Sequence, residues 1–297
     1  MLKKRYLDQK GLELISRMEL IARQTVEGFL TGRHPSPYHG SSVEYADHRP
    51  YTISDPIRML DWRLLAKTDK YYVKLFEDQT NLRCTILLDM SRSMHFAAEN
   101  RMTKLEYGCY LTTALAYLML RQNDAVGLAL FDNRLRHYLP ARSTASHFRY
   151  LVDLLETIRP REESRMGNVM HELAGRMKRR GLIILISDLL DKTEELFQAL
   201  GHFRYQKHEV IVFHIMDPHE LKFPYNRLTR FKDMEGSGTV VTNPENVRGQ
   251  YLQRLGAFLD EVRSGCLERN VSYELLATDT GWDLALSAYL GKRGRMR

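Results

Sequence analysis

Three short runs of almost wholly apolar residues constrain the fold more than any other feature of this sequence. The runs are Cys84–Leu88, Leu182–Ile186 and Val210–Ile215. Each has the length of a strand, and a strand that is apolar throughout is typical of a sheet buried on both faces. Helical segments separate the runs, and strands that alternate with helices predict a mostly parallel sheet with helices on both faces. The sequence therefore predicts an α/β, doubly wound domain from about residue 81 onward.

The rest of the chain extends this pattern in both directions. From about Gln9 to Leu30, apolar residues recur at the spacing of one helix face. We therefore expect an N-terminal helix and strand extension over residues 1–80 and the α/β domain over residues 81–297. The further predicted strands are 72–76, 125–131, 136–139 and 271–276, with a hairpin over 228–241 that turns at Gly236 to Gly238. The further predicted helices are 104–122, 146–158 capped by Ser146, 168–179 capped by Asn168, 194–205, 244–269 and 282–290.

Composition and cysteine spacing are typical of a globular protein in a reducing compartment. Hydrophobic residues make up 43% and charged residues 27% of the 297 residues, as in ordinary folded domains. The three cysteines are widely separated and form no CxxC pair, which argues against a disulfide framework and a zinc site. The strongest apolar stretch, Leu182–Ile186, is too short to cross a bilayer core of about 30 Å. No signal-peptide pattern follows the basic N-terminus, so we expect a soluble, cytoplasmic protein without a transmembrane segment.

Several classes of function lack their motifs in this sequence. The net charge of +7 comes from 44 basic and 37 acidic residues that are interspersed, so we expect no nucleic-acid partner. The chain has no glycine-rich phosphate loop of the Walker A type and no GxGxxG after a strand, which argues against nucleotide binding. His171 and Glu172 lack the second histidine of an HExxH zinc motif, and no GxSxG elbow supports a serine hydrolase.

Oxygen-rich segments follow two of the apolar runs. Asp89, Ser91 and Ser93 form an Asp-x-Ser-x-Ser motif after the first run, and Asp188 follows Ser187 after the second. Ligands of open α/β sheets bind beyond the carboxyl ends of strands, where the strand order reverses, so we expect these side chains to converge there. Carboxylates and hydroxyls are hard oxygen ligands that suit Mg²⁺, Mn²⁺ or Ca²⁺. The alternative is that these residues simply cap the helices that follow the strands.

This arrangement resembles the metal-ion-dependent adhesion site of von Willebrand factor A domains. The resemblance implies that the two serines bind a divalent metal directly, and that Asp89 and Asp188 bind it directly or through water. An ion held by few anions, with an open position, would accept a carboxylate from another protein. The family usually supplies a threonine as well, whereas the corresponding stretch here, 163–168, contains none. This departure implies a weak or vestigial site, unless Ser164 or Asn168 contributes an oxygen.

Motifs upstream of the first apolar run narrow the family. In order, they are Gly32–Ser36, Val43–Tyr51, Ser54–Arg58, Leu60–Trp62 and Lys74–Glu77. Together with the downstream motifs they resemble the bacterial proteins called domain of unknown function 58, over roughly residues 28–290. The resemblance departs at one position, where a serine, residue 54, replaces a common glycine. It also implies a partner, a MoxR-type AAA+ ATPase, with which these proteins are thought to act as adaptors in chaperone-like assembly or maturation.

Charged residues in the upstream motifs favour a structural role. Trp62 is expected to be a packing anchor. An ion network is expected to join the extension to the sheet, since burial of such a network mainly fixes geometry. Its expected members are Arg49, Asp55, Arg58, Asp61 and Glu77.

Two functions from different classes follow from the candidate site. The first is a non-enzymatic, metal-dependent module that presents Mg²⁺ or Mn²⁺ to an acidic protein ligand and acts as an adaptor with a MoxR-type AAA+ ATPase. The alternative is a Mg²⁺-dependent hydrolase in which Asp89 or Asp188 is the nucleophile or base. No lysine or nucleophile motif accompanies these carboxylates at a recognisable spacing, which favours the binding module.

Overall fold

A computed structural model describes residues 43–52, 60–78, 82–98, 101–158, 166–177, 179–233 and 238–281, except for the side chains of 43–49, 74–78 and 168. The described residues fall into two units, one within 43–78 and one from 82 to 281, and each is considered by itself. The helices expected over 9–30 and 282–290 lie outside the described residues, as do Ser164 and the tip of the expected hairpin at Gly236.

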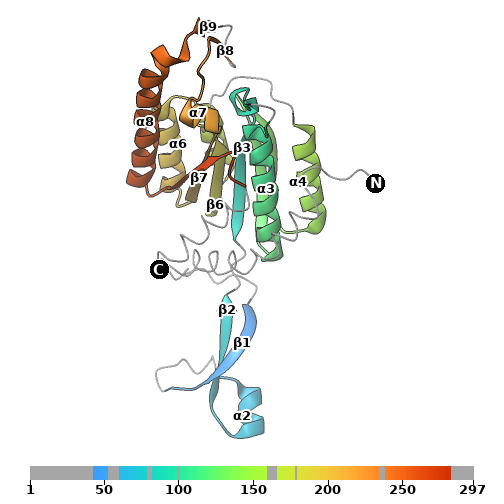
Figure 1. Cartoon of the computed structure of the whole chain (residues 1–297). Helices are drawn as coiled ribbons and strands as arrows, with labels where there is room; N and C mark the ends of the chain where they lie inside the picture. The colour runs from blue at the N-terminus through green and yellow to red at the C-terminus, as the bar shows by residue number, and fades with distance from the viewer. Residues whose placement is uncertain are drawn as a thin grey trace. The chain divides into compact units, whose positions relative to one another are not determined.

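A six-stranded sheet organises the larger unit (Figure 1). From edge to edge its strands are β10 (Ser272–Ala277), β7 (Glu209–Met216), β6 (Leu182–Ser187), β3 (Arg83–Asp89), β4 (Ala125–Phe131) and β5 (Leu135–Arg142). All neighbouring strands are parallel except β4 and β5, which are antiparallel. The three apolar runs form the strands β3, β6 and β7, which are almost entirely buried. The predicted α/β fold with a mostly parallel sheet is therefore confirmed.

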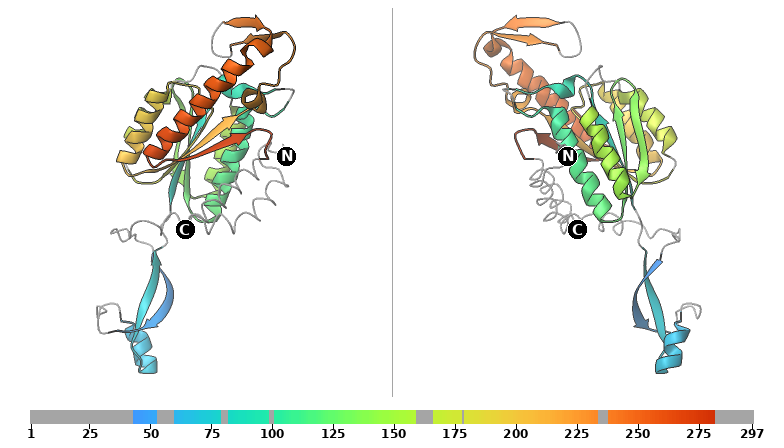
Figure 2. Two further views of the ribbon diagram at one scale, coloured as in Figure 1. Left: turned by 60° about the vertical axis from the view of Figure 1, so that its left-hand side comes forward. Right: turned by 90° about the vertical axis from the view of Figure 1, so that its right-hand side faces the viewer.

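Helices cover both faces of this sheet, as Figure 2 shows. α3 (Lys104–Arg121) lies on one face, with α4 (Ala145–Thr157) against it. The other face is covered by α5 (Met166–Arg176), α6 (Thr193–Tyr205) and α8 (Pro244–Glu268), which share a buried core with it. The three cysteines are buried and have free thiols. No helix in the described part of the chain is long and apolar enough to cross a membrane.

Two helix starts differ from the sequence predictions. α4 is capped by Thr144 and not by Ser146, because the hydroxyl of Thr144 accepts the backbone N–H of His147 at 3.3 Å. Asn168 lies inside α5, which begins no later than Met166. Serine, threonine and asparagine are all favourable caps, so the local sequence does not decide between neighbouring candidates.

A short helix that was not predicted from the sequence follows β7 at the carboxyl edge of the sheet. This helix is α7 (Pro218–Lys222), and Asp217 caps it in a capping box with Glu220. An acidic cap followed by proline and, two positions later, glutamate is a known signal for a helix start. The chain then forms β8 (Thr229–Lys232) and β9 (Thr239–Thr242), whose antiparallel pairing confirms the predicted hairpin.

The smaller unit is a two-stranded antiparallel ribbon with one helix. β1 (Val43–Pro50), a strand not predicted from the sequence, pairs with β2 (Tyr72–Asp78), and α2 (Trp62–Thr68) precedes β2. Asp61, expected in an ion network, caps α2 by accepting two backbone N–H groups of its first turn. Trp62 is 59% exposed, so it does not anchor the packing of this unit. The side chains of the other expected network members lie outside the described residues.

Asp124, at the amino edge of the larger unit's sheet, is a buried acid whose ionisation opposes folding. Its Oδ1 accepts the backbone N–H of Leu82 at 2.9 Å, and its Oδ2 has no hydrogen-bond partner among the described residues. Burial raises the pKa of this carboxyl to about 7, although the bond from Leu82 opposes the rise. The folded state therefore binds this proton more tightly than the unfolded state, whose aspartate pKa is about 4. The contribution of Asp124 to stability must fall as the pH rises from about 4 to about 7.

Asp124→Asn keeps an acceptor for the Leu82 N–H and removes the charge. We expect the variant to be more stable than the parent by about 1–2 kcal/mol at about pH 8, and the gain to shrink at about pH 5. Urea unfolding of both proteins at the two pH values measures the difference in their free energies of unfolding. The contributions of the other titrating groups are common to both proteins and cancel in this difference. An unchanged difference between the two pH values would contradict this role of Asp124.

Candidate functional site

The carboxyl ends of β3 and β6 bring together the two oxygen-rich segments of the sequence. The strands are parallel neighbours, with Leu88 paired to Ile186, so the residues that follow them emerge side by side. The hydroxyl of Ser187 donates to Oδ2 of Asp89 at 2.7 Å, although 98 positions separate the two residues. Asp89 and Asp188 are therefore held at one edge of the sheet.

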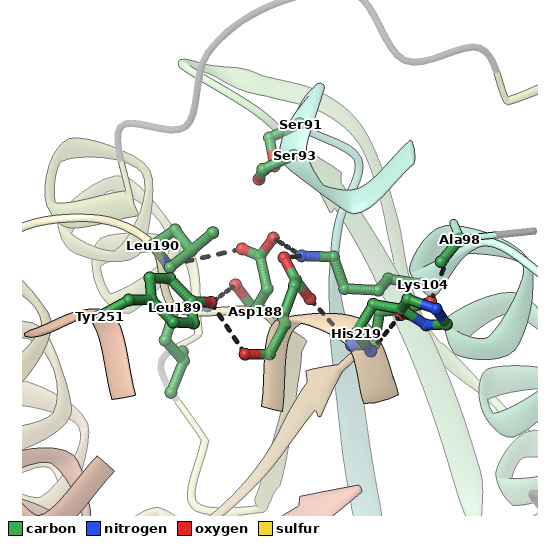
Figure 3. Close-up of polar contacts among 12 residues, drawn as sticks. Ser91, Ser93, Ala98, Lys104, Asp188, Leu189, Leu190, His219 and Tyr251 are labelled. Atoms are coloured by element: carbon green, nitrogen blue, oxygen red, sulfur yellow. Dashed lines mark hydrogen bonds and ion pairs between the residues drawn. The ribbon is translucent and has the colours of Figure 1, made fainter. Parts of the chain in front are cut away.

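Ser91 and Ser93 lie in the turn that follows β3. The backbone N–H of Ser91 donates to Oδ1 of Asp89 at 2.8 Å, and the hydroxyl groups of the two serines are hydrogen-bonded to each other, with their oxygens 3.1 Å apart. Ser93 begins η2 (Ser93–His95), a single 3-10 turn. Neither serine is more than 5% exposed. In Figure 3 the two serines lie next to each other, above the carboxylate of Asp188 in this view.

Asp188 is paired with a buried lysine. Its Oδ2 accepts a hydrogen bond from Nζ of Lys104 at 2.8 Å, and neither side chain is exposed (Figure 3). The same Nζ lies 2.8 Å from Oε1 of Glu220, on α7. Lys104 is the first residue of α3, whose start is a capping box formed by Thr103 and Glu106. The ammonium group therefore joins the end of β6 to α7.

Further contacts tie α7 to this cluster. The second carboxylate oxygen of Glu220 accepts the backbone N–H of Asp217 at 2.8 Å. Oδ2 of Asp217 accepts the backbone N–H of Ala98, in the segment between η2 and α3, at 3.3 Å. The hydroxyl of Tyr251, on α8, donates to the carbonyl oxygen of Glu220 at 2.9 Å. One polar cluster thus connects the ends of β3 and β6 with the starts of α3 and α7.

Buried carboxylates dominate the charge of the cluster. Asp89, Asp188 and Asp217 are fully buried, and the side chain of Glu220 is 17% exposed. Burial raises the pKa of Asp89 to about 7 and repulsion by Asp188 adds to the rise, while hydrogen bonds from Ser187 and Ser91 oppose it. Burial alone would lower the pKa of Lys104, but attraction to Asp188 and Glu220 outweighs it, so that pKa is raised. An additional cation near Asp89 and Asp188 would offset their mutual repulsion.

The donor set fits a small divalent ion. Two ligands at right angles on an ion with bonds of about 2.1 Å lie about 3 Å apart, and the two serine hydroxyls are 3.1 Å apart. Asp89 accepts hydrogen bonds at both carboxylate oxygens, an arrangement suited to orienting the serine turn and the β6 end around an ion. In the described parts of the chain, no three His, Cys, Asp or Glu side chains are grouped to hold a metal, so binding here would depend on the serine hydroxyls. Ser91 and Ser93 would be the direct ligands, with Asp89 and Asp188 supplying the charge.

Lys104, Asp217 and Glu220 are charged members of the cluster that sequence reasoning missed. Lys104 is 84 positions from Asp188 and 116 from Glu220, so no spacing along the chain connects them. The available signal is a lysine that begins a helix made mostly of buried residues. A lysine is almost never fully buried unless it is paired, but its partners are identified only in three dimensions.

Comparisons with known proteins identify the family. Residues 47–257 match the model of the family described as "Protein of unknown function DUF58". The uncharacterized protein Rv1480 of Mycobacterium tuberculosis is 23% identical over 222 residues, which cover 73% of this chain and 68% of the relative. The uncharacterized protein Mb1516 of Mycobacterium bovis matches to the same extent, with 23% identity over 222 residues.

Two of the solved structures that match this chain have low sequence identity to it. The conserved hypothetical protein BatB from Bacteroides thetaiotaomicron has a TM-score of 0.47 and 17% identity, covering 72% of this chain and 99% of that one. The VWA domain of SpRpn10 has a TM-score of 0.42 and 10% identity, covering 70% of this chain and 94% of that one. The family model spans most of this chain and includes the site residues from Asp89 to Glu220. The chain therefore belongs to the DUF58 family, and its larger unit is an α/β domain with a mostly parallel, six-stranded sheet.

Proposed function

We propose that this chain is a non-enzymatic protein-binding module that holds Mg²⁺ or Mn²⁺ at the carboxyl edge of its sheet. The observation that carries the proposal is the pair of buried serine hydroxyls, 3.1 Å apart, beside Asp89 and Asp188. The bound ion would supply a Lewis-acidic position for a carboxylate oxygen of a partner protein. Ser91 and Ser93 are neutral ligands, so they would leave the charge of the ion available to that carboxylate.

The contacts of the two aspartates favour binding over hydrolysis. A nucleophile or general base needs a free carboxylate oxygen directed at the substrate. Both oxygens of Asp89 accept hydrogen bonds within the fold, and Oδ2 of Asp188 is paired with Lys104. These contacts are better suited to fixing the geometry of an ion site than to attacking a substrate.

An exposed hairpin supplies a surface for a partner near the same edge. It is the β8–β9 hairpin, which α7 connects to β7 (Figure 1). Leu228 and Val241 are 75% and 58% exposed, and Val241 pairs across the hairpin with the exposed Arg230. Apolar side chains next to a basic one suit a partner surface with acidic and apolar residues. We propose that this partner is a MoxR-type AAA+ ATPase, with this chain acting as its adaptor in chaperone-like assembly or maturation.

Calorimetric titration of Mg²⁺ and Mn²⁺ into metal-free protein tests the ion site. We expect saturable binding to the parent and loss of at least about 90% of the affinity in Asp89→Ala, because the serine turn then loses its support and the site loses a charge. Asp153→Ala, a change of the same type on α4, is the matched control and should bind as the parent does. Absence of binding to a folded parent would reject the metal-dependent function.

A binding measurement with the parent and two variants tests the proposed partner. A MoxR-type ATPase immobilised on a sensor should bind the parent with Mg²⁺, and bind Asp89→Ala and Val241→Asp at least about tenfold more weakly. If the parent binds the ATPase equally well with Mg²⁺ and with a chelator, this binding does not need the ion, and the proposed metal dependence of the interaction is rejected.

A further inference from the structure

The pairing of Lys104 places a positive charge against one carboxylate of the candidate ion site. Its Nζ is 2.8 Å from Oδ2 of Asp188, one of the two carboxylates that would hold the ion, and neither side chain is exposed. Two cations that share one carboxylate repel each other, and the repulsion is stronger between buried groups than between groups in water. An ion in this site must therefore compete with the lysine for Asp188.

We propose that Lys104 is a built-in competing cation, which neutralises Asp188 when the site is empty and weakens the binding of a divalent ion. The inference rests on the proposed function and specifies how the affinity of its ion site is set. Because the lysine already pairs with Asp188, that carboxylate has a cationic partner without metal. The ion then binds as a reversible ligand and not as a structural component.

Glu220 gives the lysine a second partner for the ion-bound state. Its Oε1 lies 2.8 Å from Nζ of Lys104, and its other oxygen is held by the backbone N–H of Asp217. The ring of Phe96 also lies near, with its centroid 5.8 Å from the Nζ. When Asp188 turns to an ion, the ammonium keeps a carboxylate and does not become an unpaired buried charge.

The packing of α3 keeps the lysine at this position. Gly108, one turn after Lys104, faces the strands so closely that a Cβ there would lie 2.8 Å from Leu88 and 3.3 Å from Ile186. The capping box at Thr103 fixes the start of the same helix. The first turn of α3 therefore has little freedom to withdraw from the ends of β3 and β6.

Mn²⁺ titration of two variants tests the proposal. Lys104→Met/Glu220→Gln removes the ammonium together with its second carboxylate, which limits the loss of stability. We expect this variant to bind Mn²⁺ on the order of tenfold more tightly than the parent, since the competing charge is gone. Glu220→Gln alone keeps the lysine on Asp188 and is the matched control, for which we expect no gain in affinity. Thermal melts with Mn²⁺ and with a chelator show whether each variant is folded.

The outcomes separate this inference from the proposed function. If the parent binds Mn²⁺ and the double variant binds it no more tightly, Lys104 is only a structural residue and the inference is overturned. If only the double variant binds Mn²⁺, the parent has no metal-dependent function but the competition by Lys104 is supported. If the double variant unfolds in chelator and Mn²⁺ restores its fold, the inference is supported, and failure of Mn²⁺ to restore it overturns the inference. If neither protein binds Mn²⁺, both proposals are rejected.

Discussion

Lys104→Met should lower the free energy of unfolding by about 3–5 kcal/mol in buffer that contains a chelator. The substitution leaves Asp188 buried and unpaired by the ammonium, and it removes the same partner from Glu220. A buried charge without compensation costs far more than the pair itself contributes, because the carboxylate has lost its hydration as well as its partner. Urea unfolding followed by circular dichroism measures the change.

A surface lysine provides the control for Lys104. Lys192 also faces a carboxylate, at 3.6 Å from Glu195, but its side chain is 79% exposed. Lys192→Met should therefore change the stability by less than about 0.5 kcal/mol. If the two variants lose similar amounts of stability, the burial of the Lys104 ion pair is not the reason for its contribution to stability.

Gly181→Ala should destabilise the domain by about 3 kcal/mol, because the added methyl group would collide with the backbone of a neighbouring strand. Gly181 directly precedes β6, and a Cβ there would lie 2.4 Å from the carbonyl oxygen of Arg83, the first residue of β3. The neighbour is backbone in the centre of the sheet, so it has no side chain to rotate away. Relief requires β3 and β6 to separate, and these are the strands whose far ends hold Asp89 and Asp188.

Gly175 is the matched control for this substitution. It lies within α5, and an added Cβ there meets nothing within 4 Å. Gly175→Ala should raise the stability by about 1 kcal/mol, because alanine loses less backbone entropy than glycine in a helix. The measurement is the same urea titration, and a Gly181→Ala variant as stable as the parent would contradict the close approach of the two strands.

Local sequence patterns were sufficient to predict most strands and helices of the sheet domain. β3, β6 and β7 were recognised because strands covered on both faces need apolar residues at almost every position. Predictions failed where the local sequence signal was weak or where two neighbouring residues gave the same signal. Thr144 and Ser146 are equally plausible caps for α4, and β1 is rich in charged residues and lacks a sustained apolar alternation. Short elements such as α7 depend on a capping box and carry no periodicity to detect.

By itself, the sequence determined that Asp89, Ser91, Ser93 and Asp188 lie at or just after the ends of buried strands, because short-range patterns indicate where strands end and turns begin. Only the tertiary structure decided what these side chains contact. Ser187 reaches Asp89 because β3 and β6 are neighbours, and Lys104 reaches Asp188 because α3 packs over the ends of those strands. The physical reason is that periodicity along the chain specifies which face of an element is buried, whereas the partner of a buried charge depends on which elements pack together.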